Sequence, residues 1–364
     1  MGIGVTIATG AAPAITPDAE LTAAVAEVLV EMALGAVTRF SLIFGIDLAG
    51  GEVTLIDDPR LAPGAVLSVI ADEGETLLAR GPVIGHRIAL VQSGEGSVLE
   101  VLCADGAIAL DRAAKIKVWP GVTDSELVTQ LVGDAFNPDV QTTSSRHSET
   151  QNPFVQRGSD LATIRGLARR NGFLFWVDGA PAGPDTAHFR AAPVDAEPVA
   201  VLALGDGGSA LSRFELEFDV ERPTSASAWG LDLADKTALS GTAAQSPLAP
   251  MAERALAALA PETRAALPLG IANDAAGVTA RAESVLAAEG FFVTARTETT
   301  AQAAGRAIRA HEVVAISGAG SVHSGNYLVG AATHRIGPAA HLITLTLIRN
   351  ALGAAAGGSP WSLI

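Results

Sequence analysis

Two stretches of the chain repeat the same order of segments, and this repeat constrains the fold more than any other feature. The first begins with LAPGAVLSVIA at Leu61 and reaches a His-Arg-Ile tripeptide at His86; the second begins with IRAHEVVAISG at Ile308 and reaches the same tripeptide at His334. The spacing is 25 residues in one copy and 26 in the other, and an alternating strand follows each tripeptide. Apolar residues coincide at Val66 with Val313, Leu67 with Val314, and Val69 with Ile316. The order favours a duplicated β domain over chance similarity, and three copies of such a chain would form a ring of six similar units.

Short apolar alternations separated by Gly, Pro and Asp surround each copy. Over residues 25–118 they include RFSLIFGID, AVLSVIAD and SVLEVLCAD, and a second series runs from LSRFELEFDVE through GFFVTARTET to HLITLTLIRNAL. Alternation of this kind between turn residues predicts antiparallel strands. The chain is therefore expected to be mainly β.

A small α/β unit is predicted between the two β regions. Thr123 and Glu126 form a capping box at the start of one helix, and Ser159 is a plausible N-cap of a second helix that Gly172 ends. FLFWVDG then reads as a strand, with TAHFRAA as its hairpin partner. An Ala-rich segment at about 231–289 adds probable helices at MAERALAALA and TARAESVLAAEG.

Composition narrows the function classes. The net charge of −15 and the pI of about 4.8 argue against nucleic-acid recognition, which needs clustered Lys and Arg. The single cysteine, Cys103, lies in an apolar strand and is expected to be a buried, unreactive thiol. No apolar run is long enough for a membrane span, and the N-terminus does not read as a signal peptide, so we expect synthesis in a bacterial cytoplasm and no membrane insertion.

The sequence offers little chemistry. It has no HExxH, CxxC pair, Walker loop or GxSxG elbow, so no catalytic residue, metal site or cofactor is predicted. His323, His334 and His341 could be imagined as a metal triad, with Ser321 or Ser324 as a nucleophile, but structural or exposed histidines are the expected reading. The stretch ELEFDVE places acidic side chains on one strand face, expected to be solvated, and they are Glu215, Glu217, Asp219 and Glu221.

An ordered set of segments resembles the phage late-control D family. These are tail and baseplate hub proteins, related to the first part of valine-glycine repeat proteins and to hubs of contractile injection particles. FVQRGSDLATIRGLARRNGFLFWV is similar to the segment most typical of the family, and LAPGAVLSVI, TDSELVTQLV, SGNYLVGAATHRI and LITLTLIRNAL follow its other landmarks. The resemblance covers roughly residues 25–220 and 279–352.

The resemblance implies two tube-like antiparallel β-barrel domains plus a small α/β domain, so the fold class is mainly β with α+β insertions. The expected domains are a first β-barrel at 1–119, the α/β insertion at 120–197, a second β-barrel at 198–352 with the Ala-rich insert, and a flexible tail at 353–364. It also implies a homotrimer that adapts a trimeric spike to a hexameric inner tube, as a structural protein of an assembled phage tail or injection particle, which in some systems is released extracellularly. The expected partners are the inner tube protein, a separate spike protein and other baseplate proteins.

Two departures from the family pattern stand out. The second copy has Ala310-His311 where the first has Pro63-Gly64, and the Ala-rich insert has no clear counterpart. No β-helical spike follows the second β region, so a separate spike is expected, on which Trp361, Leu363 and Ile364 could dock; a disordered terminus is the alternative. Two other functions stay open, a β-rich hydrolase that uses the Ser/His residues of 321–341 and a monomeric carbohydrate-binding β module.

Overall fold

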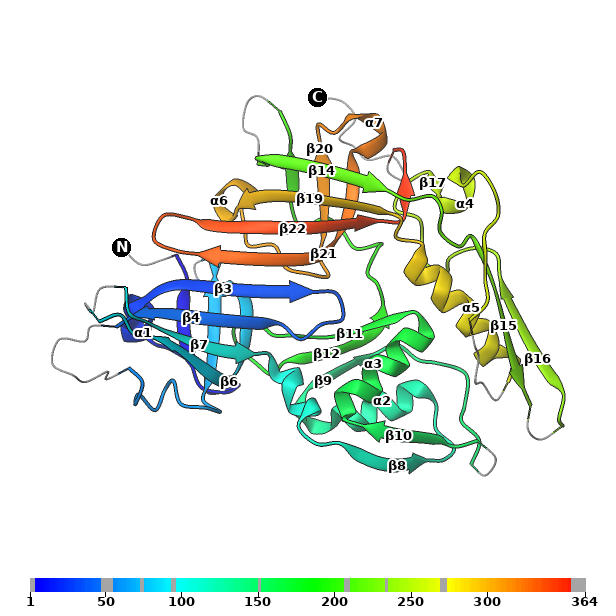
Figure 1. Cartoon of the computed structure of the whole chain (residues 1–364), viewed down its shortest axis with the longest axis horizontal. Coiled ribbons are helices and arrows are strands. Elements are labelled where there is room, and N and C mark those ends of the chain that lie inside the picture. Colours follow the sequence, from blue (N-terminus) through cyan, green and yellow to red (C-terminus); the bar gives the residue numbers. More distant parts are fainter. Residues whose placement is uncertain are drawn as a thin grey trace.

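The computed structural model describes residues 4–46, 55–72, 75–92, 96–149, 152–205, 210–232, 235–268 and 274–354. One sheet of 13 strands runs through both halves of the chain, and smaller sheets and the longer helices lie beside it (Figure 1). The predicted fold class, mainly β with two β-barrel units and an α/β unit, is confirmed. No helix among the described residues is long and apolar enough to cross a membrane.

The first β-barrel unit is built from the N-terminal strands. Its elements are β1 (Thr6–Thr9), β2 (Thr16–Pro17), α1 (Ala19–Ala24), β3 (Val25–Ala33), β4 (Arg39–Gly45), β5 (Val66–Ala71), β6 (Thr76–Ala89) and β7 (Val98–Ala104). Alternate residues of these strands point into one apolar core, which includes Phe44, Val69 and Val101. Cys103 is 1% exposed in this core, where burial raises the pKa of its thiol to about 12, so the predicted unreactive thiol is borne out.

The second β-barrel unit is built from strands of the C-terminal half. Its elements are β13 (Val201–Ala203), β14 (Arg213–Phe218), β19 (Val293–Thr300), α6 (Ala301–Ala304), β20 (Val313–Ser317), α7 (Gly320–His323), β21 (Gly325–Ile336) and β22 (His341–Arg349). They enclose a second core, in which Phe292, Tyr327 and Leu345 are almost fully buried.

The two units repeat one topology. The strand order is β3-β4-β7-β6-β5 in the first unit and β14-β19-β22-β21-β20 in the second. The departure at the strand entries is accommodated, because Gly64 and His311 both adopt a positive φ, of 91° and 70°. Gly64 N–H donates to the Val83 carbonyl at 2.8 Å, and His311 N–H donates to the Val329 carbonyl at 3.0 Å. A β-bulge follows Val83 in the first unit and Val329 in the second.

This hydrogen-bond register corrects one detail of the sequence repeat. Counted from the equivalent Val83 and Val329, His86 is the third residue onward whereas His334 is the fifth, so the two tripeptides are offset by two residues. An even offset keeps both rings on the same face of the strand. His86 also reaches the first residue of its copy, since its Nε2 lies 2.7 Å from the Leu61 carbonyl oxygen. In the second copy, the backbone of Ile308 opposes the lowering of the pKa of His334.

The α/β unit lies beside the first β-barrel unit (Figure 1). It comprises η2 (Gly106–Asp111), β8 (Lys115–Trp119), α2 (Asp124–Val132), η3 (Gly133–Ala135), β9 (Asn137–Val140), β10 (Phe154–Gly158), α3 (Asp160–Asn171), β11 (Phe173–Asp178) and β12 (Thr186–Ala191). The predicted caps are present: Thr123 and Glu126 form the capping box, Ser159 caps α3, and Gly172 ends it with a left-handed φ of 68°.

Strand β8 differs from the prediction. Its residues fall within the span assigned to the first β-barrel domain, but β8 pairs with β10 of the α/β unit. The reason is a buried contact, since Trp119 packs in the core of the α/β unit and its indole N–H donates to Gln156 Oε1 at 3.0 Å.

The Ala-rich segment and the residues just before it contain a hairpin that the sequence did not predict. Its elements are β15 (Ser225–Leu231), β16 (Ala238–Ala243), β17 (Arg254–Ala255), α4 (Leu256–Leu259), β18 (Ala265–Ala266) and α5 (Ala275–Glu289). Helix α5 includes the predicted TARAESVLAAEG segment and packs on β15 and β16. The helix predicted for MAERALAALA is wrong except for the four residues of α4, because the backbone of β17 pairs with β23 (Ala351–Leu352).

Candidate interface: an internal seam and two free sheet edges

The two β-barrel units meet at a seam between β3 and β21. These strands pair antiparallel over residues 28–33 and 331–336, and they lie side by side in the middle of the sheet (Figure 1). At its centre Val30 lies opposite His334, and neither side chain is exposed. On the outer face, Arg335 Nε lies 2.6 Å from Glu27 Oε1. The seam therefore combines a buried apolar face with an ion pair on the solvent face.

The strands equivalent to β3 and β21 have free edges. Within the described residues, β14 pairs only with β19, and beyond the bulge β6 pairs only with β7. In the seam, by contrast, β3 lies between β4 and β21. Unpaired N–H and C=O groups along a strand are a template for another strand. The chain thus carries one free edge of each kind that the seam joins.

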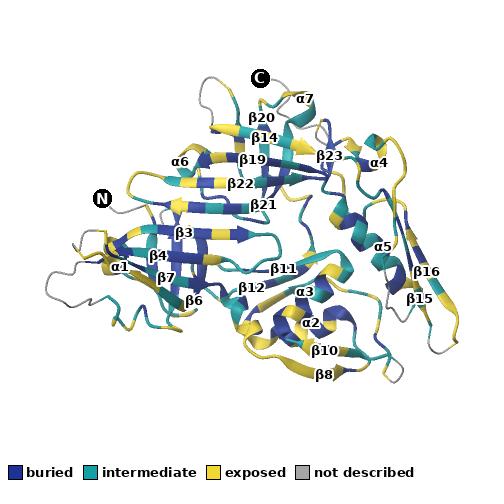
Figure 2. Ribbon diagram, viewed as in Figure 1, coloured by how far each residue is buried: buried dark blue, intermediate teal, exposed yellow. Residues whose placement is uncertain are grey.

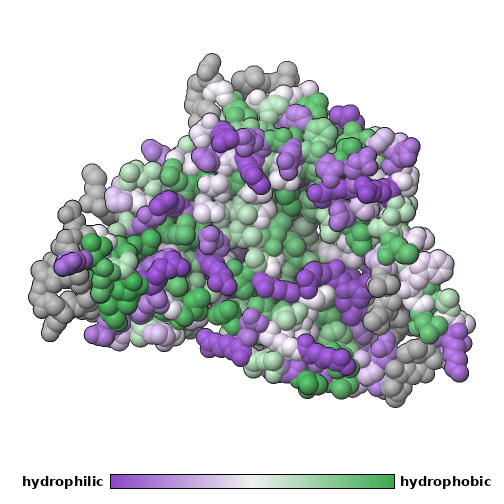
Figure 3. All heavy atoms as spheres, in the orientation of Figure 1, coloured by the Kyte–Doolittle hydropathy of each residue, from purple (hydrophilic) through white to green (hydrophobic). Residues whose placement is uncertain are grey.

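Apolar side chains accompany both free edges. Ile88 and Leu90 on the first edge are 43% and 56% exposed, and Phe218 on the second is 51% exposed. In Figure 2 exposed residues appear along β14 at the rim of the sheet, whereas buried residues alternate with more exposed ones along β3. Figure 3 shows hydrophobic side chains at the surface over β6 and β7, between charged ones. Water contact of this apolar surface costs free energy that a covering partner would recover.

The Ser/His residues of the hydrolase alternative lie in two groups at opposite ends of β21. His334 Nδ1 lies 2.8 Å from His341 Nε2 near the turn between β21 and β22. His323 lies in α7 at the other end of β21, about 30 Å of extended strand away. Ser324 Oγ accepts a hydrogen bond from Ala319 N–H at 3.1 Å, and Ser321, in α7 next to His323, lies at that same distant end.

The lowered pKa values of His334 and His341 favour the neutral form of both side chains. Burial, together with the neighbouring His341, lowers the pKa of His334 to about 3. Burial also lowers the pKa of His341, to about 4, against the opposing influence of Asp72. In the described part of the chain, no three His, Cys, Asp or Glu side chains gather as a metal site.

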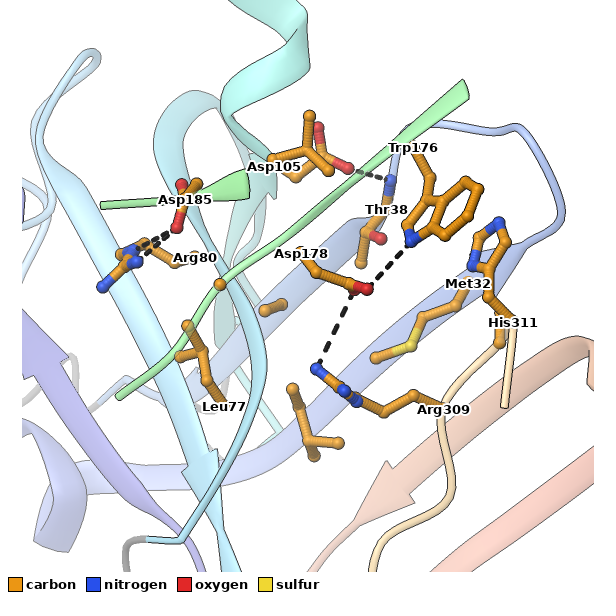
Figure 4. A pocket seen from close by; sticks show the side chains of 15 residues that line it. Met32, Thr38, Leu77, Arg80, Asp105, Trp176, Asp178, Asp185, Arg309 and His311 are labelled. Atoms are coloured by element: carbon orange, nitrogen blue, oxygen red, sulfur yellow. Dashed lines mark hydrogen bonds and ion pairs between the residues drawn. The ribbon is translucent and has the colours of Figure 1, made fainter. Parts of the chain in front are cut away.

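A pocket forms where the α/β unit meets both β-barrel units (Figure 4). The Trp176 ring stacks on His311, with 4.3 Å between centroids, and its Nε1–H donates to Asp178 Oδ2 at 2.8 Å. Arg309 Nη1 lies 3.8 Å from Asp178 Oδ1. Because these polar side chains pair with one another across the pocket, we interpret it as the junction that fixes the α/β unit.

A buried carboxyl completes this junction. Asp105 accepts hydrogen bonds from the N–H groups of Thr38 and Ala107, at 2.6 and 2.9 Å, yet burial raises its pKa to about 7. Nearby, Arg80 pairs with Asp185 of the α/β unit. These contacts span the first β-barrel unit and the loop before β12, and nothing in the sequence pattern links them.

The remaining residues singled out from the sequence lie on or just after β14 or in the C-terminal tail. Glu215 and Glu217 are exposed on β14, and Asp219 and Glu221 follow it on the solvent side as predicted. The proposed docking residues Trp361, Leu363 and Ile364 lie outside the described residues. Sequence reasoning identified the alternation of ELEFDVE but missed the free edge, because the exposure of Phe218 is visible only in the structure.

Three solved structures share the fold over most of the chain. The tail protein from Neisseria meningitidis MC58 superposes with a TM-score of 0.64 at 12% identity, covering 95% of this chain and 97% of that one. The 43 kDa tail protein of prophage MuSo2 from Shewanella oneidensis gives 0.62 at 14% identity, covering 95% and 98%. The Escherichia coli c3393 protein, a component of the type VI secretion system described as similar to the T4 tail proteins gp27 and gp5, gives 0.58 at 12% identity, covering 92% and 76%.

These comparisons establish the fold that the sequence resemblance implied, that of phage tail proteins and their secretion-system counterparts. No curated protein matches the sequence significantly. The family whose model matches is not the late-control D family that the sequence resembles. That model is described as the Alg8 N-terminal domain and spans residues 17–337, most of the chain, and the protein therefore belongs to this family.

Proposed function

We propose that the protein is a structural, non-enzymatic baseplate hub of a contractile phage tail or a phage-derived contractile injection system. It acts as a homotrimer that adapts a trimeric spike to a hexameric inner tube. The observation that carries the proposal is the repeated strand order of the two β-barrel units. Three chains with two similar units each present six similar surfaces on one side while keeping threefold symmetry on the other.

The fold neighbours and the surface chemistry support this role. The neighbours are tail proteins and a component of a type VI secretion system. The partners in the proposal are the inner tube protein, a separate spike protein and other baseplate proteins. A net charge of −15 disfavours a grip on nucleic acid, so the lumen of such a ring lets DNA or cargo pass without holding it.

Electron microscopy of the purified chain, alone and with the co-expressed inner tube protein, tests the proposal. We expect end-on class averages with three chains around a lumen and six similar inner features, and a solution mass of three chains. A chain that stays monomeric with the inner tube protein present, or a ring with another number of chains, contradicts the hub. A hydrolytic activity lost in Ser321→Ala or His334→Gln while assembly persists would favour the enzyme instead.

A further inference from the structure

We propose that residues 85–90 at the free edge of β6 pair antiparallel with residues 214–219 at the free edge of β14 in a second copy of the chain. The pairing repeats, between chains, the seam that β21 and β3 form within one chain. The inference rests on the proposed function only for the number of copies in the ring. The pairing itself follows from the strand register.

The equivalence of positions on β6 and β21 comes from hydrogen bonds. Val83 and Val329 each precede a bulge and each accept from the residue that leads into the neighbouring strand. Three strands onward, Val83 connects through Cys103 and Phe40 to Val30. The parallel route in the second unit connects Val329 through Leu347 and Ala295 to Leu216.

Leu216 therefore occupies the place of Val30. By the same count Ile88 occupies the place of His334, because each is the fifth residue beyond Val83 or Val329. Since Val30 and His334 are directly opposite in the seam, Ile88 of one chain lies opposite Leu216 of the next.

The transferred register brings compatible side chains together. On the core face Ile88 meets Leu216, His86 meets Phe218 and Leu90 meets Phe214. On the outer face Arg87 lies directly opposite Glu217. Apolar and opposite-charge pairs across antiparallel strands each contribute about 0.2–1 kcal/mol. None of these matches was used to set the register.

Exposure supports the same register. The seam positions Val28, Val30 and Met32 are at most 7% exposed, and so are Ala332, His334 and Ile336. Their counterparts at the free edges include Phe218, Ile88 and Leu90, which are 51%, 43% and 56% exposed. The free edges thus carry apolar residues at the positions that the seam covers, as expected if another chain covers them.

The interface is head-to-tail. The β6 edge and the β14 edge are different surfaces, so each chain uses one to bind the chain before it and the other to bind the chain after it. Such an arrangement either closes into a ring or continues as an open filament. Closure after three chains makes the six β-barrel units continuous around the ring.

Paired cysteines test the register directly. The double variant Arg87→Cys with Glu217→Cys places two thiols directly opposite, where Cα atoms about 4.5–5.5 Å apart permit a disulfide. The Arg87 side chain is 71% exposed and Glu217 is exposed, so we expect the fold to tolerate both changes, with loss of the surface ion pair between Arg87 and Glu100. The native Cys103 is buried and does not compete.

The matched control is Arg87→Cys with Arg213→Cys. This pair would be opposite if the two His-Arg-Ile tripeptides were equivalent, but in the proposed register the two residues are four positions apart, about 13 Å. We expect mild oxidation to link the Arg87/Glu217 variant into covalent multimers and to leave the control unlinked. A mixture of the two single variants, Arg87→Cys and Glu217→Cys, should give covalent dimers only.

The outcomes separate the pairing from the hub. Absence of linkage in the Arg87/Glu217 variant, or linkage in the control instead, overturns the proposed pairing even if three-chain rings are seen. Dimers of Arg87→Cys alone also overturn it, because they require a symmetric interface. Linkage of the expected kind in open filaments, or in rings of another size, upholds the pairing and contradicts the trimeric hub.

Discussion

The seam between β3 and β21 and the free edges of β14 and β6 are built from equivalent strands. These strands are paired at the seam and unpaired at the free edges. At the seam, a β14-type strand meets a β6-type strand and buries every core-facing residue. At the free edges, the equivalent strands end the described pairing and leave apolar side chains in water. The difference identifies the apolar positions that a second chain has to cover if the free edges are to match the seam.

A charge at the centre of the seam should have the largest effect, and it tests how the seam differs from the free edge. Val30→Asp places a carboxylate in the fully buried seam, and we expect it to cost about 3 kcal/mol or more or to prevent folding. The matched variant Leu216→Asp changes the equivalent, partly exposed residue of β14. It should cost the isolated chain much less but abolish its assembly.

Denaturant unfolding and sedimentation measure these two effects. Equal loss of stability in both variants would show that β14 is as deeply buried in the isolated chain as β3. Retained assembly in Leu216→Asp would show that the free edge is not an interface. The comparison therefore distinguishes a folding seam from an assembly seam.

Acid should weaken the internal seam. Burial holds the pKa of His334 at about 3 and that of His341 at about 4, below the unfolded value of 6.5. The folded chain therefore binds fewer protons than the unfolded chain between these values, so this contribution to stability is full above pH 6.5 and is lost as the pH falls toward 4. His334 faces His341 and Arg309, and His341 faces Asp72. Ile88, at the equivalent free-edge position, cannot titrate.

Removing one ring of the pair isolates this effect. Melting temperatures between pH 7 and 5 should fall less in His341→Asn than in the parent chain, because one proton-binding group of the unfolded state is gone. Protonation of Asp105 and His311 contributes equally to both proteins and cancels in the difference. Identical pH slopes would exclude His341 as a determinant of acid stability.

Local signals predicted much of the α/β unit. The capping box at Thr123, the N-cap at Ser159 and the left-handed Gly172 were each readable within a few residues. Their physical cause is local, because helix ends are satisfied by nearby side chains and by a permissive glycine. The pairing of β11 with β12 followed from two alternating segments and an intervening turn.

Features that depend on distant pairing were missed. The sequence aligned His86 with His334, but the strand register places His86 level with Ala332, two residues before His334. The MAERALAALA segment has helix-forming residues, yet Met251 N–H donates to Asn350 Oδ1 at 2.8 Å and β17 pairs with the end of the chain. Free edges could not be predicted, because an edge is defined by the strand that is not beside it.

The strand entries provide a smaller contrast between the units. Gly64 has a φ of 91° and an open space where a Cβ would lie, so Gly64→Ala adds only backbone strain. We expect a loss of about 1–2 kcal/mol in unfolding free energy. The control Gly45→Ala, which has equal space but no positive φ, should change stability little. Equal effects in both variants would mean that the positive φ of this entry is not a constraint.

The outer face of the seam gives the smallest effect on folding. The Arg335 side chain is 66% exposed where it pairs with Glu27, so Arg335→Ala should cost less than about 1 kcal/mol. At the proposed interface between chains, Arg87→Glu sets two negative charges opposite each other at Glu217 and should weaken assembly. Because Arg87 also pairs with Glu100 within the chain, the melting temperature should fall slightly as well. Adding Glu217→Arg to the same chain restores opposite charges and should recover assembly, as measured by sedimentation. A double variant no better than Arg87→Glu alone would contradict the proposed register, in which the two side chains lie directly opposite and their opposite charges attract.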